Sequence, residues 1–169
     1  MKQFKRLFAA ILLGAMLLTV FTGCTRSPNK EKNVFNVLKT ALGDKYEITE
    51  DAELQKKAET FAKVFVKGEN LESNRNVGRA YAKVSESEKE FWEIMDADKP
   101  CVMPAQHITK NDKVNAALFL PYTDNAAAII PMLTNLGVLS EIQENEYHKV
   151  GIAIANVKGD DYVVIVADK

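Results

Sequence analysis

Few residues in this chain are of the types that carry out acid–base or metal chemistry near neutral pH. The chain contains two histidines, His107 and His148, and imidazole is the commonest metal ligand and general base in this pH range. His107 lies in a polar, turn-like segment, and His148 immediately precedes an apolar one. Neither has another ligand four residues away on an expected helix, so the spacing of a helical zinc site is missing. We expect no metal centre and no cofactor, and both histidines are kept only as candidate ligand-binding residues.

Other chemistries also lack their sequence patterns. The chain has no Gly-x-Ser-x-Gly elbow for a serine nucleophile and no glycine-rich phosphate loop. Gly159-Asp160-Asp161 joins two adjacent acids, which lack the spaced oxygens of a calcium loop and indicate a solvated turn. Trp92, next to Phe91 on an expected helix, is a candidate platform for a ligand, although a core position for Phe91 and a partly buried edge for Trp92 are the simpler expectation. We expect no catalytic residue.

The first 24 residues have the pattern of a secretory leader. A basic start is followed by an apolar run from Leu7 to Val20 and then by Phe21-Thr22-Gly23-Cys24. This order is typical of a signal peptide, which we predict over residues 1–23. The alternative is an uncleaved membrane anchor, for which the 17 residues from Leu7 to Gly23 are at the lower limit of the ~20 needed to cross a bilayer.

The cysteine after Thr-Gly resembles that of a bacterial lipobox, although Phe21 stands where leucine is usual. This resemblance implies that Cys24 is acylated on its thiol and becomes the mature N-terminus, at the extracytoplasmic face of the cell membrane. Loss of Lys2, Lys5 and Arg6 with the leader would change the net charge from −1 to −4. Acyl chains rather than a basic patch would then hold the protein on the membrane. The same charge balance argues against nucleic acid as a partner.

The remaining chain predicts one domain with helices first and strands last. Residues 24–32 are polar and predict a lipidated cysteine with a tether, followed by a single domain over residues 33–169. Helical spacing of apolar residues predicts helices over 33–42, over 50–67 with Thr49 as cap, over 85–95 with Ser85 in a capping box, and over 123–136. Residues 69–82 are polar and glycine-punctuated, and predict a loop with one helical turn.

The last third of the chain changes to a period of two. We expect a strand over residues 113–120 and another over 149–156. In the second, branched residues (Val150, Ile152, Ile154) alternate with small ones (Gly151, Ala153, Ala155), which indicates a sheet closely packed on both faces. A turn at 158–161 and a partner strand over 162–166 complete an antiparallel hairpin. The fold class expected from these elements is α+β.

Two segments resemble the CAP superfamily, which comprises the cysteine-rich secretory, antigen 5 and pathogenesis-related 1 proteins. They are the Leu-x3-Ala-x2-Phe-Ala pattern from Leu54 to Ala62, and residues 147–155 followed by a Gly-Asp turn and Tyr162-Val163-Val164. Gly151 fits the family's strand motif, whereas Ala153 and Ala155 replace its second glycine position. The resemblance implies a three-layer α-β-α sandwich that ends in the hairpin.

The family's cavity is usually marked by two histidines and two acids, one of the acids in a Gly-Glu-Asn-hydrophobic motif. Gly68-Glu69-Asn70-Leu71 reproduces that motif, so the resemblance implies Glu69 as a ligand-binding residue. Val138 stands where the second histidine would be, and no histidine precedes Glu69. The resemblance therefore implies no two-histidine metal site in this chain.

Three hypotheses arise for function. The first is a membrane-anchored extracytoplasmic lipoprotein whose non-enzymatic, CAP-like domain binds a peptide, a glycan or a small hydrophobic ligand. The second is an envelope hydrolase that acts on peptide or peptidoglycan, with Glu69 and one histidine as its acid–base pair. The third is a small adaptor subunit of an envelope complex. The missing catalytic patterns favour the first.

Overall fold

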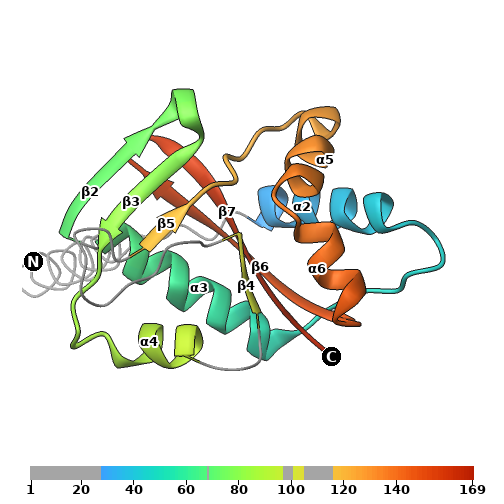
Figure 1. The fold of residues 1–169 in the computed structure, drawn as a ribbon, viewed down its shortest axis with the longest axis horizontal. Helices are drawn as coiled ribbons and strands as arrows, with labels where there is room; N and C mark the ends of the chain where they lie inside the picture. Colours follow the sequence, from blue (N-terminus) through green and yellow to red (C-terminus); the bar gives the residue numbers. More distant parts are fainter. Residues whose placement is uncertain (1–27, 68, 97–100, 105–115) are drawn as a thin grey trace, which may run out of the picture.

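Figure 1 shows the chain as a computed structural model. The structure describes residues 28–67, 69–96, 101–104 and 116–169. These residues form a mixed α+β fold, which confirms the class expected from the sequence. The helices are α2 (Pro28–Leu42), α3 (Ala52–Lys67), α4 (Lys89–Asp96), α5 (Ala126–Asn135), α6 (Val138–Glu144) and the 3₁₀ helix η1 (Arg75–Val77). The strands are β1 (Thr49–Glu50), β2 (Glu69–Asn74), β3 (Arg79–Lys83), β4 (Cys101–Met103), β5 (Ala116–Leu118), β6 (Lys149–Val157) and β7 (Asp160–Asp168).

The larger sheet has the strand order β1-β6-β7-β4. Its two central strands, β6 and β7, pair antiparallel from Lys149 opposite Asp168 to Val157 opposite Asp160. Only Lys158 and Gly159 connect them, with φ angles of 51° and 89°. Positive φ at both loop positions is typical of the type I′ turn, whose twist matches that of the strands it joins. The turn therefore lies at one end of the sheet, and the candidate site is built around it.

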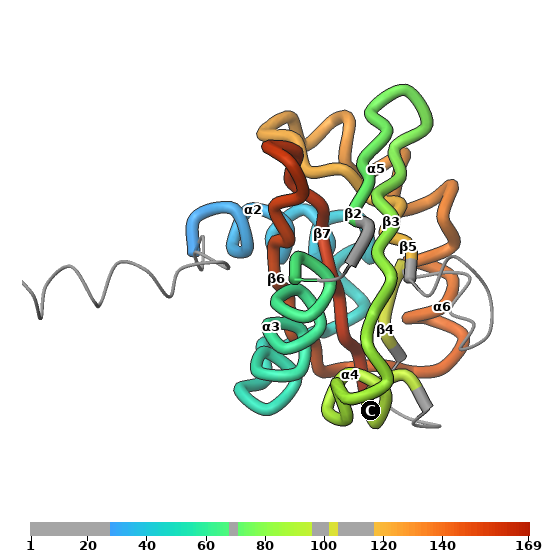
Figure 2. The backbone as a smooth tube through the Cα atoms, turned by 90° about the vertical axis from the view of Figure 1, so that its left-hand side faces the viewer, coloured from blue at the N-terminus to red at the C-terminus, as the bar shows by residue number. Residues whose placement is uncertain are grey.

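Helices lie on both faces of this sheet (Figures 1 and 2). Ala153 and Ala155 of β6 share a core with Phe61 and Phe65 of α3. On the opposite face, the branched residues of β6 share a second core with α2, α5 and α6. The alternation of large and small residues along residues 149–156 thus corresponds to two separate cores, as the sequence predicts, because successive side chains of a strand point to opposite faces.

Helix α3 approaches β6 very closely at Gly151. A Cβ atom at Gly151 would lie only 2.1 Å from the carbonyl carbon of Leu54 and 2.3 Å from the backbone nitrogen of Gln55. The Gln55 side chain also hydrogen-bonds the backbone of β6: its Nε2 donates to the Ile152 carbonyl at 2.8 Å, and its Oε1 accepts from the Ile152 N–H at 3.0 Å. Because β1 ends at Glu50, this side chain continues the hydrogen bonding of β6 where the neighbouring strand stops.

Two helices begin elsewhere than the sequence predicts. Helix α2 begins at Pro28, so the second half of the predicted tether is helical; proline is favoured in a first helical turn, where its missing N–H costs nothing. Thr49 does not cap α3, because it belongs to β1 and pairs with Lys149. The cap is Asp51, whose Oδ1 accepts from the N–H groups of Glu53 and Leu54 at 2.9 and 3.0 Å.

The later helices are also shorter or divided. Helix α4 begins at Lys89 rather than at Ser85, and Ser85 instead precedes it in a turn. Asn125 caps α5 by accepting from the Ala127 N–H at 3.0 Å. Gly137, with φ of 73°, ends the α5 segment, and α6 follows directly as a helix that the sequence did not indicate. A left-handed residue at a helix end is typical of glycine.

The loop prediction over residues 69–82 is wrong except for its helical turn, because this segment is mostly strand. It forms β2, η1 and most of β3, which pair with β5 in a second sheet of order β2-β3-β5. Only the small residues Ala80 and Ala82 of β3 are fully buried, while Arg79 and Lys83 are exposed. Such a strand has too weak an apolar period to be distinguished from a loop in the sequence.

Among the described residues, no single helix is both long and apolar enough to span a membrane; helices α5 and α6 together meet the length and composition test, with a bend of 62° between them.

Candidate binding site

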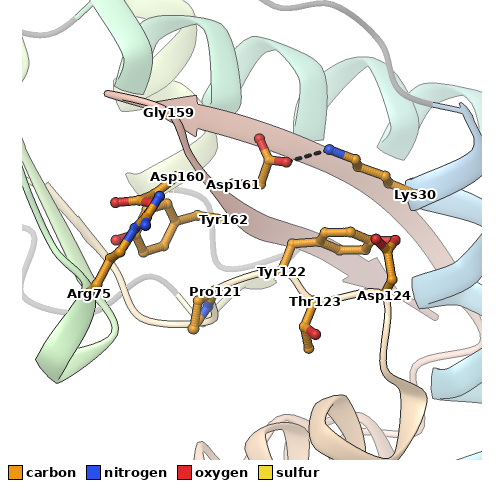
Figure 3. Close-up of a pocket in the computed structure, with 10 residues that line it drawn as sticks. All are labelled: Lys30, Arg75, Pro121, Tyr122, Thr123, Asp124, Gly159, Asp160, Asp161 and Tyr162. Atoms are coloured by element: carbon orange, nitrogen blue, oxygen red, sulfur yellow. Dashed lines mark hydrogen bonds and ion pairs between the residues drawn. The ribbon is translucent and has the colours of Figure 1, made fainter.

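A hollow of about 460 Å³ lies at the end of the central sheet, beside the turn between β6 and β7 (Figure 3). Three separate parts of the chain surround this turn: the first turn of α2 with Lys30, the 3₁₀ helix η1 with Arg75, and residues 121–124 that lead into α5. We call this feature the turn hollow.

Backbone pairing fixes the floor of the turn hollow. Pro121 and Tyr162 form an antiparallel bridge. On either side of it, the Tyr122 N–H donates to the Asp161 carbonyl and the Val163 N–H donates to the Leu120 carbonyl, both at 2.8 Å. The segment before α5 therefore runs along the start of β7 like a short additional strand, and it holds Tyr122 beside the acids of the turn.

Asp161 joins the turn to helix α2. Its Oδ2 accepts from the Lys30 Nζ at 2.5 Å, and its Oδ1 accepts from the Asn156 Nδ2 at 2.7 Å. Burial alone would raise the pKa of Asp161, but the hydrogen bonds from Lys30 and Asn156 outweigh burial and hold the pKa below its ordinary value. The hydrogen bond to Asp161 in turn raises the pKa of Lys30. Both groups are therefore charged at neutral pH.

This ion pair predicts a pH-dependent contribution to stability. The pKa of Asp161 is lower in the folded chain, so the contribution is fully present above the unfolded-state value of about 3.9 and is lost as pH falls through the folded value. We expect the difference in free energy of unfolding between the wild type and Asp161→Asn to shrink below about pH 4. Urea unfolding from pH 7 to pH 3 measures it, with the exposed Asp44→Asn as control. A difference that stays constant over this range would contradict the ion pair.

Asp160 joins the same turn to the second sheet. Its Oδ1 pairs with the Nε of Arg75, and its Oδ2 accepts from the Ser73 hydroxyl at 3.3 Å. The Arg75 side chain is 76% exposed, so its outer N–H groups face solvent beside the turn hollow. Tyr162 is 1% exposed, and its hydroxyl donates to the Arg79 carbonyl at 3.2 Å. These contacts attach the β2–β3 hairpin to the start of β7.

Tyr122 forms the polar centre of the other wall. Its hydroxyl donates to Asp124 Oδ1 at 2.6 Å and accepts from Asn33 Nδ2 at 3.3 Å. The Lys30 ammonium lies 5.4 Å from the centre of the Tyr122 ring, within the range of a cation–π contact. Burial, followed by the hydrogen bond to Asp124, raises the pKa of Tyr122, so the phenol stays protonated at neutral pH. These contacts fix the position of the Tyr122 ring and of the polar groups around it.

The turn hollow is lined by charged and polar side chains from several parts of the chain. Two cationic side chains and three carboxylates line it, and each cation is paired with a carboxylate. No histidine, cysteine or serine is among the described residues that line it. Within the described part of the chain, no group of three or more metal-ligating side chains is found. What the lining offers is a set of oriented hydrogen-bond donors and acceptors around a tyrosine ring.

A second hollow, of about 530 Å³, lies between α3 and α4. Its lining is mostly charged side chains on the outer faces of the two helices, including Glu53, Lys56, Glu90 and Glu93. Mixed charges are the ordinary composition of solvent-facing helix surfaces. The second hollow therefore has the composition of an ordinary solvent-facing helix surface.

Neither Trp92 nor His148, two of the residues proposed from the sequence, lines either hollow. Cys24 and His107 lie outside the described residues. Glu69 pairs with Lys83 at the start of the second sheet. His148 is exposed near the start of β6, with its Nδ1 2.8 Å from the Glu47 carbonyl oxygen and its ring stacked on Tyr46 at 5.0 Å.

Glu69 and His148 belong to segments at opposite ends of helix α3. The Thr49 N–H donates to the His148 carbonyl just before α3, whereas Glu69 comes directly after α3 ends at Lys67. A straight helix of 16 residues is about 24 Å long, so these two residues lie near opposite ends of it. Acid–base partners must be within hydrogen-bond reach of one substrate, so this separation does not favour Glu69 and His148 as such a pair.

Trp92 is not a surface platform. The side chain is 7% exposed, its Nε1 donates to the Ser85 carbonyl at 2.9 Å, and its ring meets the edge of Phe91 with a centroid distance of 5.0 Å. It is more deeply buried than the partly buried edge that the sequence suggested. Phe91, fully buried in the core, matches its prediction. A buried ring whose polar atom is already hydrogen-bonded offers no face to a ligand.

The residues that do converge were missed in the sequence, apart from the two acids of the turn. Asp160 and Asp161 were noted as a solvated turn, whereas both make ion pairs with distant segments. Lys30 and Arg75 lie 131 and 85 residues away from their partners. The local sequence showed only two acids directly after a glycine in a turn. This pattern predicts negative charge at the end of a hairpin, but it does not identify the side chains that pair with the two acids.

No family model, curated protein or solved structure matches this chain. Fold and function are therefore inferred from the residues themselves.

Proposed function

We propose that this chain is a lipoprotein, anchored by acyl chains on Cys24 at the extracytoplasmic face of the cell membrane, whose folded domain binds a ligand without transforming it. The proposal of a lipid anchor rests on the leader that ends in Thr22-Gly23-Cys24. Helix α2 begins at Pro28, with only three residues between it and this cysteine. An apolar leader followed by an acylated cysteine and a water-soluble domain is a sufficient membrane attachment, because two acyl chains anchor a protein stably.

The turn hollow supports a binding function. Its polar groups are fixed by contacts from three parts of the chain, as in sites whose few placed polar groups orient a ligand. The separation of Glu69 from His148 does not favour this pair, which is one of the two alternative acid–base pairs of the hydrolase hypothesis. A non-enzymatic binding domain therefore agrees best with the described residues.

A divergent CAP-like sandwich remains the finer proposal for the fold. It is supported by the central position of β6 and β7 in their sheet and by the helices on both faces. The second sheet, β2-β3-β5, would be an addition to the three layers that the resemblance implies. An experimental structure with helices on one face only would overturn this proposal.

Replacement of the anchoring thiol tests the proposed function. In cells that make the full chain, Cys24→Ser should shift the protein from the membrane fraction and abolish incorporation of labelled palmitate, because serine cannot form the thioether to the diacylglyceryl group. Fractionation with immunoblotting and labelling measure both effects.

Cys101→Ser is the matched control, because it removes the other cysteine of the chain. This variant should keep both label and membrane association. If Cys24→Ser still sedimented with the membrane, or if the wild type took up no palmitate, the lipoprotein proposal would be wrong.

A further inference from the structure

The turn hollow must lie near the membrane if Cys24 carries the anchor, so its position there rests on the proposed function. Four Cα-to-Cα steps separate Cys24 from Pro28, and a fully extended chain covers about 3.5 Å per step, or about 14 Å in all. Lys30 is in the first turn of the helix that begins there, and it reaches Asp161 of the turn hollow. The opposite end of the β6–β7 hairpin is about 30 Å away, since each strand has nine residues.

The charges of the turn hollow do not favour an ion. Lys30 and Arg75 carry positive charge, but Asp161 and Asp160 neutralise them in place, and Asp124 adds a further negative charge. An anion would meet these carboxylates, which repel it. A cation would have to compete with the Lys30 ammonium, which already occupies the position against Asp161 and beside the Tyr122 ring.

A neutral ligand rich in hydroxyl groups fits the same lining. Each hydroxyl both donates and accepts, so it can bind a carboxylate such as Asp124 and an N–H group such as those of Arg75. Hydrogen bonds to charged groups are stronger than those between neutral groups. The half-exposed Pro121 and Tyr122 supply an apolar surface for the C–H groups of a ring. Sugars combine these two properties.

We propose that the turn hollow binds a neutral sugar ring presented at the surface of the bilayer that anchors the chain. A ligand in the same membrane is concentrated near the site by the anchor itself, so a shallow, open site is sufficient. The sugar is the headgroup of a membrane glycolipid in this proposal, and a free sugar is the alternative source of the same chemistry.

The test uses the full, acylated chain, isotope-labelled, in phosphatidylcholine nanodiscs. Addition of a minor fraction of glucosyl and galactosyl diacylglycerol should shift the amide resonances of Thr123, Gly159 and Asp161, and leave those of Lys56 and Glu93 at the second hollow unchanged. Parallel samples receive other probes instead of the glycolipids. Methyl glucoside and methyl galactoside test a free sugar, inorganic phosphate tests an anion, and 1,5-diaminopentane tests a cation. A gadolinium-chelating lipid at the membrane surface should broaden the amide resonance of Gly159 more strongly than that of Lys149, which is at the far end of β6.

Two variants change the lining of the turn hollow. Tyr122→Leu removes the ring and should weaken glycolipid binding about tenfold, and Asp124→Asn should weaken it while it preserves the shape of the wall. Thr60→Ala, in the second hollow, is the matched control and should bind as the wild type does. Unchanged resonances far from the turn hollow show that each variant is folded.

Glycolipid-dependent shifts confined to the turn hollow, lost in Tyr122→Leu, are the expected result. The proposal is overturned if neither glycolipid nor free sugar shifts these resonances, if phosphate or the diamine shifts them more strongly, or if only free sugar acts. If the chain does not remain on the nanodiscs, the lipid anchor of the proposed function is refuted. The samples with free sugar then still test whether the turn hollow binds a sugar.

Discussion

Gly151→Ala is expected to destabilise the domain by about 3 kcal/mol or more. The added Cβ would lie 2.1 Å from the Leu54 carbonyl carbon, and the atoms it meets are backbone atoms of α3. A backbone cannot rotate away as a side chain can, so α3 would have to move off β6 and the core between them would open. Urea unfolding of the purified variant measures the loss.

Gly137→Ala separates this steric effect from the conformational freedom of glycine. Gly137 has φ of 73°, and nothing lies within 4 Å of a Cβ built there. Alanine at a left-handed position costs about 1–2 kcal/mol through the backbone alone. If Gly151→Ala were no more destabilising than Gly137→Ala, the close packing of α3 on β6 would be contradicted.

Gln55→Leu is expected to cost about 2 to 4 kcal/mol, because it leaves both the N–H and the carbonyl of Ile152 without their partner, at about 1–3 kcal/mol for each group. Ile152 is buried, so water cannot easily replace the lost hydrogen bonds. Leucine keeps nearly the volume of glutamine, and the effect therefore reports the hydrogen bonds rather than a cavity.

Gln55→Glu provides a graded comparison. A carboxylate can still accept from the Ile152 N–H but cannot donate to its carbonyl, so this variant should lie between the wild type and Gln55→Leu. Lys56→Leu, at the exposed next position of α3, should change the free energy of unfolding by no more than about 0.5 kcal/mol. Equal stabilities of Gln55→Leu and Lys56→Leu would show that the side chain does not support β6.

The parts of the fold with a strong apolar period were predictable from the sequence. Helices α2 and α3 cover the expected segments, although α2 begins earlier than expected, because one stripe of each is buried in a core. Residues 149–156 alternate large and small side chains, and the structure gives them two different cores. In these segments the local pattern and the tertiary packing favour the same structure.

The second sheet was not predictable, because its stability comes from contacts that the local pattern does not encode. Residues 69–83 contain few large apolar side chains. Their strands are held by the pairing of β2 with β3 and of β3 with β5, and by the attachment of Ser73 and Arg75 to Asp160. The turn hollow was not predictable for the same reason, because its residues come together only through tertiary contacts. Lys30 and Tyr122 show no motif, and only the folded chain brings them to the acids of the turn.

Mass spectrometry of the native protein, purified from membranes, tests the central claim most directly. We predict that the first peptide begins at Cys24 and carries the mass of a diacylglyceryl group on its sulfur. An intact Met1, or a first peptide whose Cys24 is unmodified, would contradict the lipid anchor and, with it, the placement of the turn hollow at the membrane surface.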